Sequence, residues 1–259
     1  MNYALITGAS KGIGKAIAID LAQKGHAVLL VARSEQLLKE LAEEINQQYN
    51  VAAAYLAIDL AHNAAPKVIL DWCMEQNYQV DMLINNAGYG LNGLLEDYTL
   101  EAHLAMMQVN MNSLVALTYL FLPHLKQAPR AFIGNIASSA AYQSVPGLNT
   151  YAATKSFVLS FSRGLAYELR KSTVSVSCVS PGATDTDFAN RANVTNAKAI
   201  KLAEKFNMSP ADVAAIAVEG ILAGKIEIVP GFVNKIAKVL ANLLPDRLLE
   251  KSAADIYGI

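Results

Sequence analysis

The chain has 259 residues, 53% of them hydrophobic, and its 21 basic and 22 acidic residues leave a net charge of −1. This apolar content suffices for a core on both faces of a sheet, in one large α/β domain or two small ones. The balanced charge excludes a general attraction to nucleic acid or to an anionic membrane, and the four histidines show no metal-ligand spacing, so we expect no metal site.

Three features bear on the compartment. The chain begins with a β-like run rather than a charged stretch before an apolar one, so we expect no secretory signal. No run of 18 apolar residues occurs, which predicts no transmembrane segment. Cys73 and Cys178 stand far apart in apolar surroundings, which is typical of core cysteines in a reducing compartment. We therefore expect a soluble cytoplasmic protein.

Short β-type runs alternate with longer helical patterns along the chain. Strands are predicted at Tyr3 to Ile6, Ala27 to Val31, Val51 to Ile58, Met82 to Ile84, Phe132 to Ile136, Val174 to Val179 and Ile226 to Val229. Helices are predicted from the first glycine turn to about Lys24, after Ser34, from Ala64 to Gln76, from Leu100 to Leu122 with Pro123 ending or kinking it, and from Thr150 to Arg170. This order predicts an α/β fold: a doubly wound, parallel seven-stranded sheet with helices on both faces, in a single domain.

A glycine-rich turn follows the first strand and opens the first helix, with the sequence Thr7-Gly8-Ala9-Ser10-Lys11-Gly12-Ile13-Gly14. Gly8 suits the tight turn, Gly12 lets the backbone approach a pyrophosphate, and Gly14 allows close packing of helix on sheet. The free N–H groups at the helix start favour phosphate. The turn therefore predicts a dinucleotide site that includes Ser10, Lys11 and Ile13.

The end of the second strand bears on which dinucleotide binds. An acidic residue there would bind the 2′-hydroxyl of NAD, but the chain reads Ala32-Arg33-Ser34. Arg33, helped by Lys11 and the Ser10 hydroxyl, offers charge-assisted bonds to a 2′-phosphate. We therefore expect NADP(H), with NAD as the less favoured cofactor.

Tyr151 and Lys155 are four residues apart in a predicted helix, which brings their side chains to one face. A free phenol has a pKa of about 10, and a fixed positive charge nearby lowers it. The pair therefore predicts an acid/base group whose pKa Lys155 lowers.

Together these motifs resemble the short-chain dehydrogenase/reductase family, in its compact form of one domain, from residue 2 to about residue 230. Further motifs that are similar to the family's follow in order: Asp59-Leu60, Asn85-Asn86-Ala87-Gly88, Asn110, Ser138 at 13 residues before Tyr151, and Pro181-Gly182 with Thr184 and Thr186. The resemblance implies a catalytic tetrad of Asn110, Ser138, Tyr151 and Lys155, with Asn110 in a proton relay and Ser138 holding the substrate oxygen. It also implies that Asp59 and Leu60 hold the adenine, that Asn86, Ala87 and Gly88 line the cofactor site, that Lys155 binds the nicotinamide ribose, and that the segment from Pro181 to Thr186 clasps the nicotinamide.

Two departures from the family pattern concern the active site. Ser139 follows Ser138, so the neighbouring hydroxyl stays an alternative for the catalytic one. Ala141 stands where a glycine is common, and Tyr142 after it is expected to alter the rim of the pocket.

These residues predict an NADP(H)-dependent oxidoreductase that transfers hydride between the cofactor and a ketone, an aldehyde or, in reverse, a secondary alcohol. Loops at Tyr89 to Leu91, Tyr142 to Pro146 and after Asp187 are expected to contact the substrate. They contribute an apolar set that favours a hydrophobic or lipid-like carbonyl compound: Tyr89, Leu91, Tyr142, Val145 and Phe188. A catalytically inactive dinucleotide sensor and an isomerase or dehydratase are the alternative functions.

We divide the chain into a dinucleotide-binding and catalytic part, 1–230, and an amphipathic helical extension of the same domain, 231–259. The extension has an apolar stripe at helical spacing, formed by Ile236, Val239, Leu240, Leu243 and Leu244. We expect the stripe to pack against its own domain; a subunit contact or substrate lid, and a membrane-surface helix, are the alternatives. The family resemblance implies a homodimer or homotetramer that uses the helices at 100–122 and 151–170.

Overall fold

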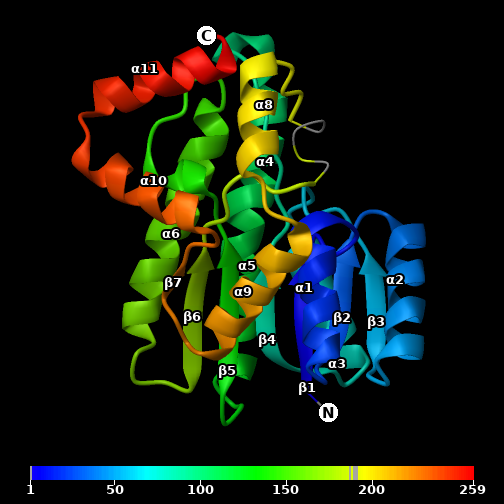
Figure 1. The fold of residues 1–259 in the computed structure, drawn as a ribbon. Coiled ribbons are helices and arrows are strands. Elements are labelled where there is room, and N and C mark those ends of the chain that lie inside the picture. The colour runs from blue at the N-terminus through cyan, green and yellow to red at the C-terminus, as the bar shows by residue number, and fades with distance from the viewer. Residues whose placement is uncertain (1, 187, 189–191) are drawn as a thin grey trace.

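A parallel sheet of seven strands forms the centre of the molecule (Figure 1). The computed structural model describes residues 2–186, 188 and 192–259. The strands are β1 (Asn2–Thr7), β2 (Ala27–Ala32), β3 (Ala53–Ala57), β4 (Gln79–Asn85), β5 (Ala131–Ile136), β6 (Val174–Val179) and β7 (Glu227–Ile228), in the order β3-β2-β1-β4-β5-β6-β7. The predicted doubly wound seven-stranded sheet is confirmed, and the predicted strands differ from the observed ones only at their ends.

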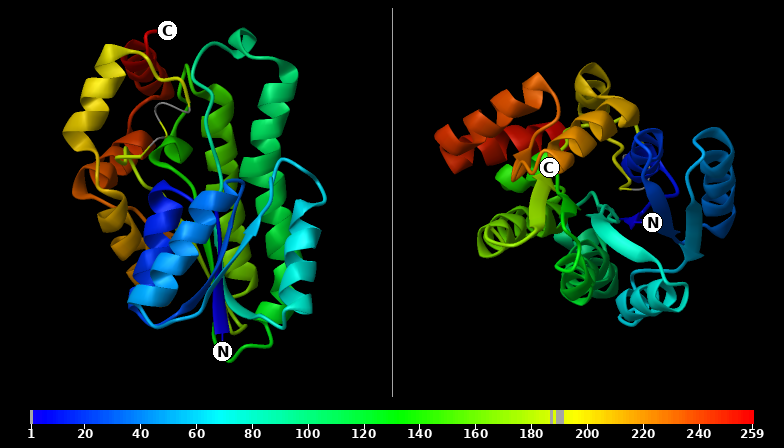
Figure 2. Two further views of the ribbon diagram at one scale, coloured as in Figure 1. Left: turned by 90° about the vertical axis from the view of Figure 1, so that its right-hand side faces the viewer. Right: turned by 90° about the horizontal axis from the view of Figure 1, so that it is seen from below.

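Helices cover both faces of this sheet, as the end-on view in Figure 2 shows. Ile6 and Leu30 point to the layer of α1 (Gly12–Gln23), α2 (Glu35–Gln48) and α9 (Pro210–Leu222). Leu5 and Leu29, one residue earlier on each strand, point to the layer of α3 (Ala65–Glu75), α5 (Ser113–Leu125) and α6 (Asn149–Glu168). Because alternate residues of a strand face opposite sides, strands buried on both faces are nearly continuous apolar runs. The positions of these strands were therefore predictable from the sequence.

The long helix predicted from Leu100 to Leu122 is interrupted and runs further than expected. It consists of α4 (Leu100–Met107), a π-helical segment η2 (Gln108–Asn112) and α5, which continues through Pro123 to Leu125. The prediction that Pro123 ends the helix is wrong: proline removes the bond to the carbonyl of Tyr119, whose residue is exposed to water. The π-helical segment contains Asn110, one of the predicted site residues.

The same stretch bears on the prediction that the chain has no transmembrane segment. Among the described residues, Leu100–Leu125 is apolar and long enough to cross a membrane by length and composition alone, with 39% of its most apolar window buried. The core helix of a globular protein passes the same test, and α5 packs against β4 and α3 here. The stretch is therefore weak evidence for a membrane span.

The last part of the chain lies at the end of the molecule opposite the N-terminus (Figures 1 and 2). It contains α8 (Ala197–Phe206), which follows a stretch with no element assigned from the sequence, and the extension α10 (Phe232–Leu243) and α11 (Asp246–Tyr257). The prediction that the apolar stripe packs against its own domain is wrong, since all five of its side chains are between 41% and 74% exposed. α10 is attached by its other face, where Lys238 pairs with Glu227 at 2.7 Å.

Candidate active site

A cavity of about 700 Å³ opens at the carboxyl ends of the strands. It brings together 18 of the 20 residues predicted for the site: Gly8, Ser10, Lys11, Gly12, Ile13, Arg33, Asp59, Leu60, Asn86, Ala87, Gly88, Ser138, Tyr151, Lys155, Pro181, Gly182, Thr184 and Thr186. The other two, Gly14 and Asn110, lie behind its wall. Ligands of open α/β sheets bind at this edge, where the loops after several strands meet.

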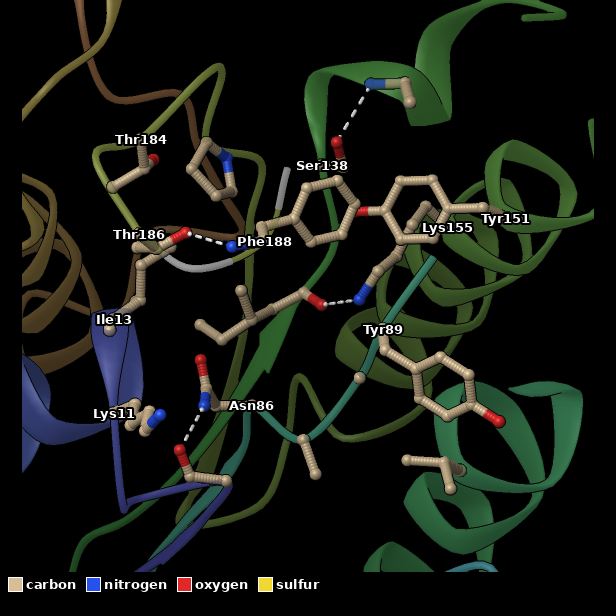
Figure 3. A pocket seen from close by; sticks show the side chains of 18 of the residues that line it. Lys11, Ile13, Asn86, Tyr89, Ser138, Tyr151, Lys155, Thr184, Thr186 and Phe188 are labelled. Atoms are coloured by element: carbon tan, nitrogen blue, oxygen red, sulfur yellow. Dashed lines mark hydrogen bonds between the residues drawn. The ribbon is translucent and has the colours of Figure 1, made fainter. Parts of the chain in front are cut away.

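The glycine turn forms one end of the cavity with its backbone. Gly8 and Gly12 have φ angles of +65° and +56°, which residues other than glycine rarely adopt. A Cβ at Gly14 would collide with the carbonyl oxygen of Gly8. The Asn86 amide Nδ2 donates to the carbonyl oxygens of Thr7 and Gly8, at 3.0 and 3.2 Å, and so holds the turn against the end of β4 (Figure 3). A narrow backbone cradle at the start of α1 fits a dinucleotide phosphate.

Arg33 and Asp59 face each other at the same end, after β2 and β3. Arg33 Nη1 lies 3.8 Å from Asp59 Oδ2, and the Arg33 side chain is 59% exposed. An exposed ion pair at this distance holds its partners weakly. The guanidinium therefore stays accessible to an anionic group in the cavity, beside Lys11.

Tyr151 and Lys155 lie on the buried face of α6, as their spacing predicts. Lys155 Nζ donates a 2.9 Å hydrogen bond to the Ile136 carbonyl at the end of β5, and it lies 5.8 Å from the centre of the Tyr151 ring (Figure 3). The β-strand carbonyl thus fixes the ammonium beside the phenol.

The pKa values of this pair differ from the prediction that Lys155 lowers that of Tyr151. Burial raises the pKa of Tyr151 to about 12, against a smaller lowering by a hydrogen bond with Ser138. Burial also lowers the pKa of Lys155 to about 8. Desolvation disfavours the charged form of each group and is the largest cause of both shifts. The phenol is accordingly protonated at neutral pH.

Ser138 directly follows the loop after β5 and reaches the phenol. Its hydroxyl accepts a hydrogen bond from the Ala140 amide at 3.1 Å, at the start of the 3-10 turn η3 (Ser139–Tyr142). Of the two candidate serines, Ser138 is the one whose hydroxyl lowers the pKa of Tyr151 by hydrogen bonding, while the Ser139 amide donates to the Pro181 carbonyl at 2.8 Å. The geometry therefore favours Ser138 over Ser139.

Asn110 lies in the π-helical segment and is 1% exposed. Its Nδ2 donates to the Tyr89 carbonyl and to Thr154 Oγ1, both at 3.0 Å, and its Oδ1 accepts from the Tyr89 amide at 3.1 Å. A Cβ at Gly88 would lie 3.1 Å from this Oδ1 and 3.2 Å from Lys155 Nζ. Asn110 and Lys155 thus flank one small space above Gly88. π-Helical segments are frequent at functional sites.

The predicted substrate contacts divide into two groups. Tyr89 and Phe188 line the cavity, whereas Leu91, Tyr142 and Val145 do not. Phe188 packs on Tyr151 with ring centres 5.2 Å apart. The prediction that Tyr142 shapes the rim is wrong, because its hydroxyl donates to the carboxylate of Glu227, outside the cavity.

Tyr89 is directed away from Tyr151, as the position of its hydroxyl in Figure 3 shows. Burial raises the pKa of Tyr89, and the charges of Arg33 and Asp59 act on it as smaller causes. In the segment after Asp187, Asp187 itself and residues 189–191 lie outside the described part of the chain.

The sequence analysis missed several residues that line the cavity. They are Leu148, Val194, Ala199, Ile200 and Tyr257. Leu148 directly precedes α6 as its N-cap and lies outside the predicted helix, so helical spacing did not point to it. The others come from α8, its approach and the C-terminus, which only the folded chain brings to the cavity.

Comparison with known proteins places this fold and site in a family. The sequence profile for the short chain dehydrogenases matches residues 2–197. The chain belongs to the short-chain dehydrogenase family. An uncharacterized oxidoreductase of Staphylococcus epidermidis is 32% identical over 196 residues, which cover 73% of this chain and 84% of that protein.

Solved structures of other short-chain dehydrogenases superpose along most of the chain. An enzyme of Sphingobium yanoikuyae in complex with NADPH matches with a TM-score of 0.81 and 28% identity, covering 95% of this chain and 96% of that one. The 3-ketoacyl-(acyl-carrier-protein) reductase of Brucella melitensis, complexed with NADH, matches with a TM-score of 0.78 and 28% identity, covering 88% and 94%. Relatives at equal distance thus hold different nicotinamide cofactors, and the preference of this oxidoreductase has to be argued from its own residues.

Proposed function

We propose that this protein is an NADP(H)-dependent oxidoreductase that interconverts a hydrophobic ketone or aldehyde and the corresponding alcohol. One observation carries the proposal: Tyr151, Ser138 and Lys155 converge within the cavity that the glycine turn closes at its other end. A sensor that had lost catalysis would not need a buried phenol with a hydrogen-bonded serine beside it. When bound, NADPH supplies the hydride for this chemistry.

Tyr151 acts as the acid in the reducing direction. Its phenol, with a pKa raised to about 12 by burial, holds its proton across the physiological range and donates it to the oxygen of the carbonyl as negative charge develops there. Ser138 holds the same oxygen through its hydroxyl and orients the carbonyl toward the phenol. In the direction of alcohol oxidation, the phenolate takes the proton back.

Lys155 and Asn110 assist Tyr151 in its role as the acid. The ammonium of Lys155 lies beside the ring of Tyr151 and favours the phenolate that forms when the proton leaves. It also offers donors to ribose hydroxyls. Asn110 faces Lys155 across the space above Gly88, which suits the return of protons to the site through Lys155.

NADP(H) is the cofactor that the residues favour over NAD(H). Gly8, Gly12 and the start of α1 would hold the pyrophosphate, and Pro181, Gly182, Thr184 and Thr186 the nicotinamide. No acidic residue ends β2; instead Arg33, with Ser10 and Lys11 nearby, suits a 2′-phosphate. Asp59, 3.8 Å from Arg33, leaves the guanidinium accessible, and Leu60 and Ala87 provide apolar surface.

The remaining properties follow from the cavity wall and the surface. Leu148 and Phe188, which line the cavity and pack with Tyr151, are apolar, which suits a hydrophobic or lipid-like carbonyl compound. Exposed Tyr119 and Phe157 on α5 and α6 suit a homodimer or homotetramer through these helices. Reduction is the proposed direction, in a cytoplasm that keeps NADP mostly reduced.

Absorbance at 340 nm with a panel of aliphatic and cyclic ketones tests the function. We expect NADPH to be consumed stoichiometrically with alcohol formed, and NADH to be used with a kcat/KM at least about tenfold lower. An isomerase or dehydratase would convert its substrate without net consumption of cofactor. Consumption of NADH in preference to NADPH would contradict the cofactor assignment, and absence of turnover with any ketone, aldehyde or alcohol would contradict the reaction class.

A further inference from the structure

The last turn of α11 brings the C-terminus into the wall of the active-site cavity. Tyr257 lines the cavity although it is 106 positions after Tyr151 in the sequence. A Cβ at Gly147 would lie 3.0 Å from the Cβ of Tyr257 and 3.2 Å from Ile259, and Gly147 has a φ of +83°. The loop before α6 therefore accepts the C-terminal segment only because residue 147 has no side chain.

α11 is fixed in this position by apolar packing. Ala253, one turn before Tyr257, is 4% exposed and belongs to the same cluster as Met106, Val145, Leu148 and Tyr151. Tyr257 packs against this cluster. The two phenols are close enough for Tyr257 to act on the pKa of Tyr151. Tyr257 is thus part of the wall around the catalytic group.

The hydroxyl of Tyr257 is an unusual group in this wall. Within the described part of the chain it has no hydrogen-bond partner, its residue is half-buried, and burial raises its pKa. Leu148, Phe188 and Ala140, which line the cavity and belong to or pack against the same cluster, offer no polar side-chain atom. Tyr89 also lines it, but its hydroxyl points away from Tyr151 (Figure 3). A substrate that fills the cavity would take the Tyr257 hydroxyl out of contact with water, so a substrate that pairs this hydroxyl gains affinity over one that leaves it unpaired.

We propose that Tyr257 is a specificity-determining residue whose hydroxyl binds a second oxygen of the substrate, apart from the carbonyl at Tyr151. The proposal rests on the proposed function and names its substrate class: apolar ketones that bear an additional hydroxyl or carbonyl group across the carbon skeleton from the reacting carbon. The reacting carbonyl is held by Ser138 and Tyr151, and the apolar skeleton by Phe188 and Leu148. The second oxygen fixes which end of the skeleton enters first.

Discrimination of this kind can be large. A site with a buried polar group disfavours the analogue that lacks the matching oxygen, because the group is then left without its partner. Replacement of the hydroxyl by hydrogen removes both the attraction for the second oxygen and the penalty for its absence. The selectivity of the enzyme between the two substrates should then collapse.

The test compares kcat/KM with NADPH for pairs of cyclic ketones that differ by one remote hydroxyl or carbonyl. We expect the wild-type enzyme to prefer the oxygenated member, and Tyr257→Phe to lower kcat/KM for that member about tenfold while kcat/KM for the parent ketone stays the same or rises. Tyr49→Phe, which makes the same chemical change beside α2 and outside the cavity, is the matched control and should retain the wild-type ratio. Tyr257→Leu also lacks the hydroxyl and should lose the preference for the oxygenated ketone too. It repeats the test if Tyr257→Phe folds poorly.

Two results would overturn the inference while leaving the reaction class intact. One is a ratio of kcat/KM between the two ketones that stays at the wild-type value in both Tyr257 variants, while their thermal unfolding matches wild type. The other is an equal loss of kcat/KM for both members of each pair, which a merely structural role of Tyr257 would give. If the wild-type enzyme consumes no NADPH with either member, the proposed function itself fails. Turnover of the parent ketone by the wild-type enzyme thus distinguishes failure of the inference about Tyr257 from failure of the proposed function.

Discussion

The two parts of the chain on either side of residue 197 build opposite sides of the active site in different ways. Residues 2–197, which the family shares, hold the cofactor end with backbone: glycines at Gly8 and Gly12 and carbonyls fixed by Asn86. Residues 198–259 contribute side chains, above all Tyr257, Ala199 and Ile200. Backbone geometry tolerates little substitution, whereas a side-chain wall changes with each residue. The difference shows that the part shared with the family forms the glycine-turn end of the cavity, while residues beyond the family match complete its wall.

Glu227 joins the two parts. Its carboxylate accepts from Tyr142 and Arg163 of the first part and from Lys238 of α10. Burial alone would raise the pKa of this carboxyl, but these three hydrogen bonds lower it to about 2. α10 is therefore attached next to η3, which begins directly after Ser138.

The largest expected effect concerns the backbone of the cofactor end. Gly14→Ala places a methyl group against the carbonyl of Gly8 and the amide of Asn86, so the turn has to open. We expect the Kd for NADPH, measured by fluorescence titration, to rise about 100-fold or more, with a loss of a few kcal/mol in the free energy of unfolding.

Gly164→Ala is its control, because a Cβ there meets nothing within 4 Å. It should leave NADPH affinity unchanged and stabilise α6 by about 0.5–1 kcal/mol. Equal behaviour of the two variants would show that the turn is not a close-packed cradle.

The next effect concerns the choice of cofactor in the first part. Arg33→Ala removes the cation proposed for the 2′-phosphate, and we expect KM for NADPH to rise about 10- to 100-fold while KM for NADH changes by less than about threefold. Arg247→Ala, which removes an exposed cation from α11 in the second part, should change neither. A parallel rise in both KM values for Arg33→Ala would argue against 2′-phosphate recognition.

The pH dependence of kcat/KM tests the roles of Lys155 and Tyr151, which both lie in the first part of the chain. Burial lowers the pKa of Lys155 to about 8 and raises that of Tyr151 to about 12. As pH rises through about 8, Lys155 loses its charge while Tyr151 keeps its proton, so kcat/KM for ketone reduction should fall up to tenfold per pH unit above that point. A profile that is flat to pH 10 would remove Lys155 from the mechanism.

The smallest effect concerns the junction between the two parts. Glu227→Gln removes the charge that three donors bind, and we expect a loss of about 1–3 kcal/mol in the free energy of unfolding at pH 7 by urea titration. Because the pKa of Glu227 is lowered in the folded state, its contribution is present above about pH 4.5 and lost as pH falls toward about 2. The gap between wild type and Glu227→Gln should close over that range. Glu43→Gln, at an exposed position of α2, should show no gap at either end.

Much of the first part could be predicted from the sequence. Buried parallel strands are short apolar runs, and β2 was located to within one residue because its run is bounded by His26 and Arg33. The spacing of Tyr151 and Lys155 fixed their common helix face. The pKa of Tyr151 was not predictable, since it depends on how completely the folded chain removes water from the phenol.

The second part was less predictable, for reasons of tertiary structure. The stripe on α10 had the spacing of a buried helix face, yet the helix attaches through Lys238 and leaves the stripe exposed. Periodicity shows which side chains share a face, but not which surface covers that face. Tyr257 reaches Tyr151 only through the packing of Ala253 and the open space at Gly147. No local pattern encodes such a contact.

The turnover of Tyr151→Phe with NADPH and a cyclic ketone tests the central claim most directly. The substitution removes one hydroxyl from a 7% exposed ring and should leave NADPH affinity and thermal unfolding close to wild type. We predict that kcat/KM falls about 10²- to 10⁴-fold, because the carbonyl loses its proton donor. Turnover within about twofold of wild type, with folding and NADPH binding intact, would contradict the assignment of Tyr151 as the acid.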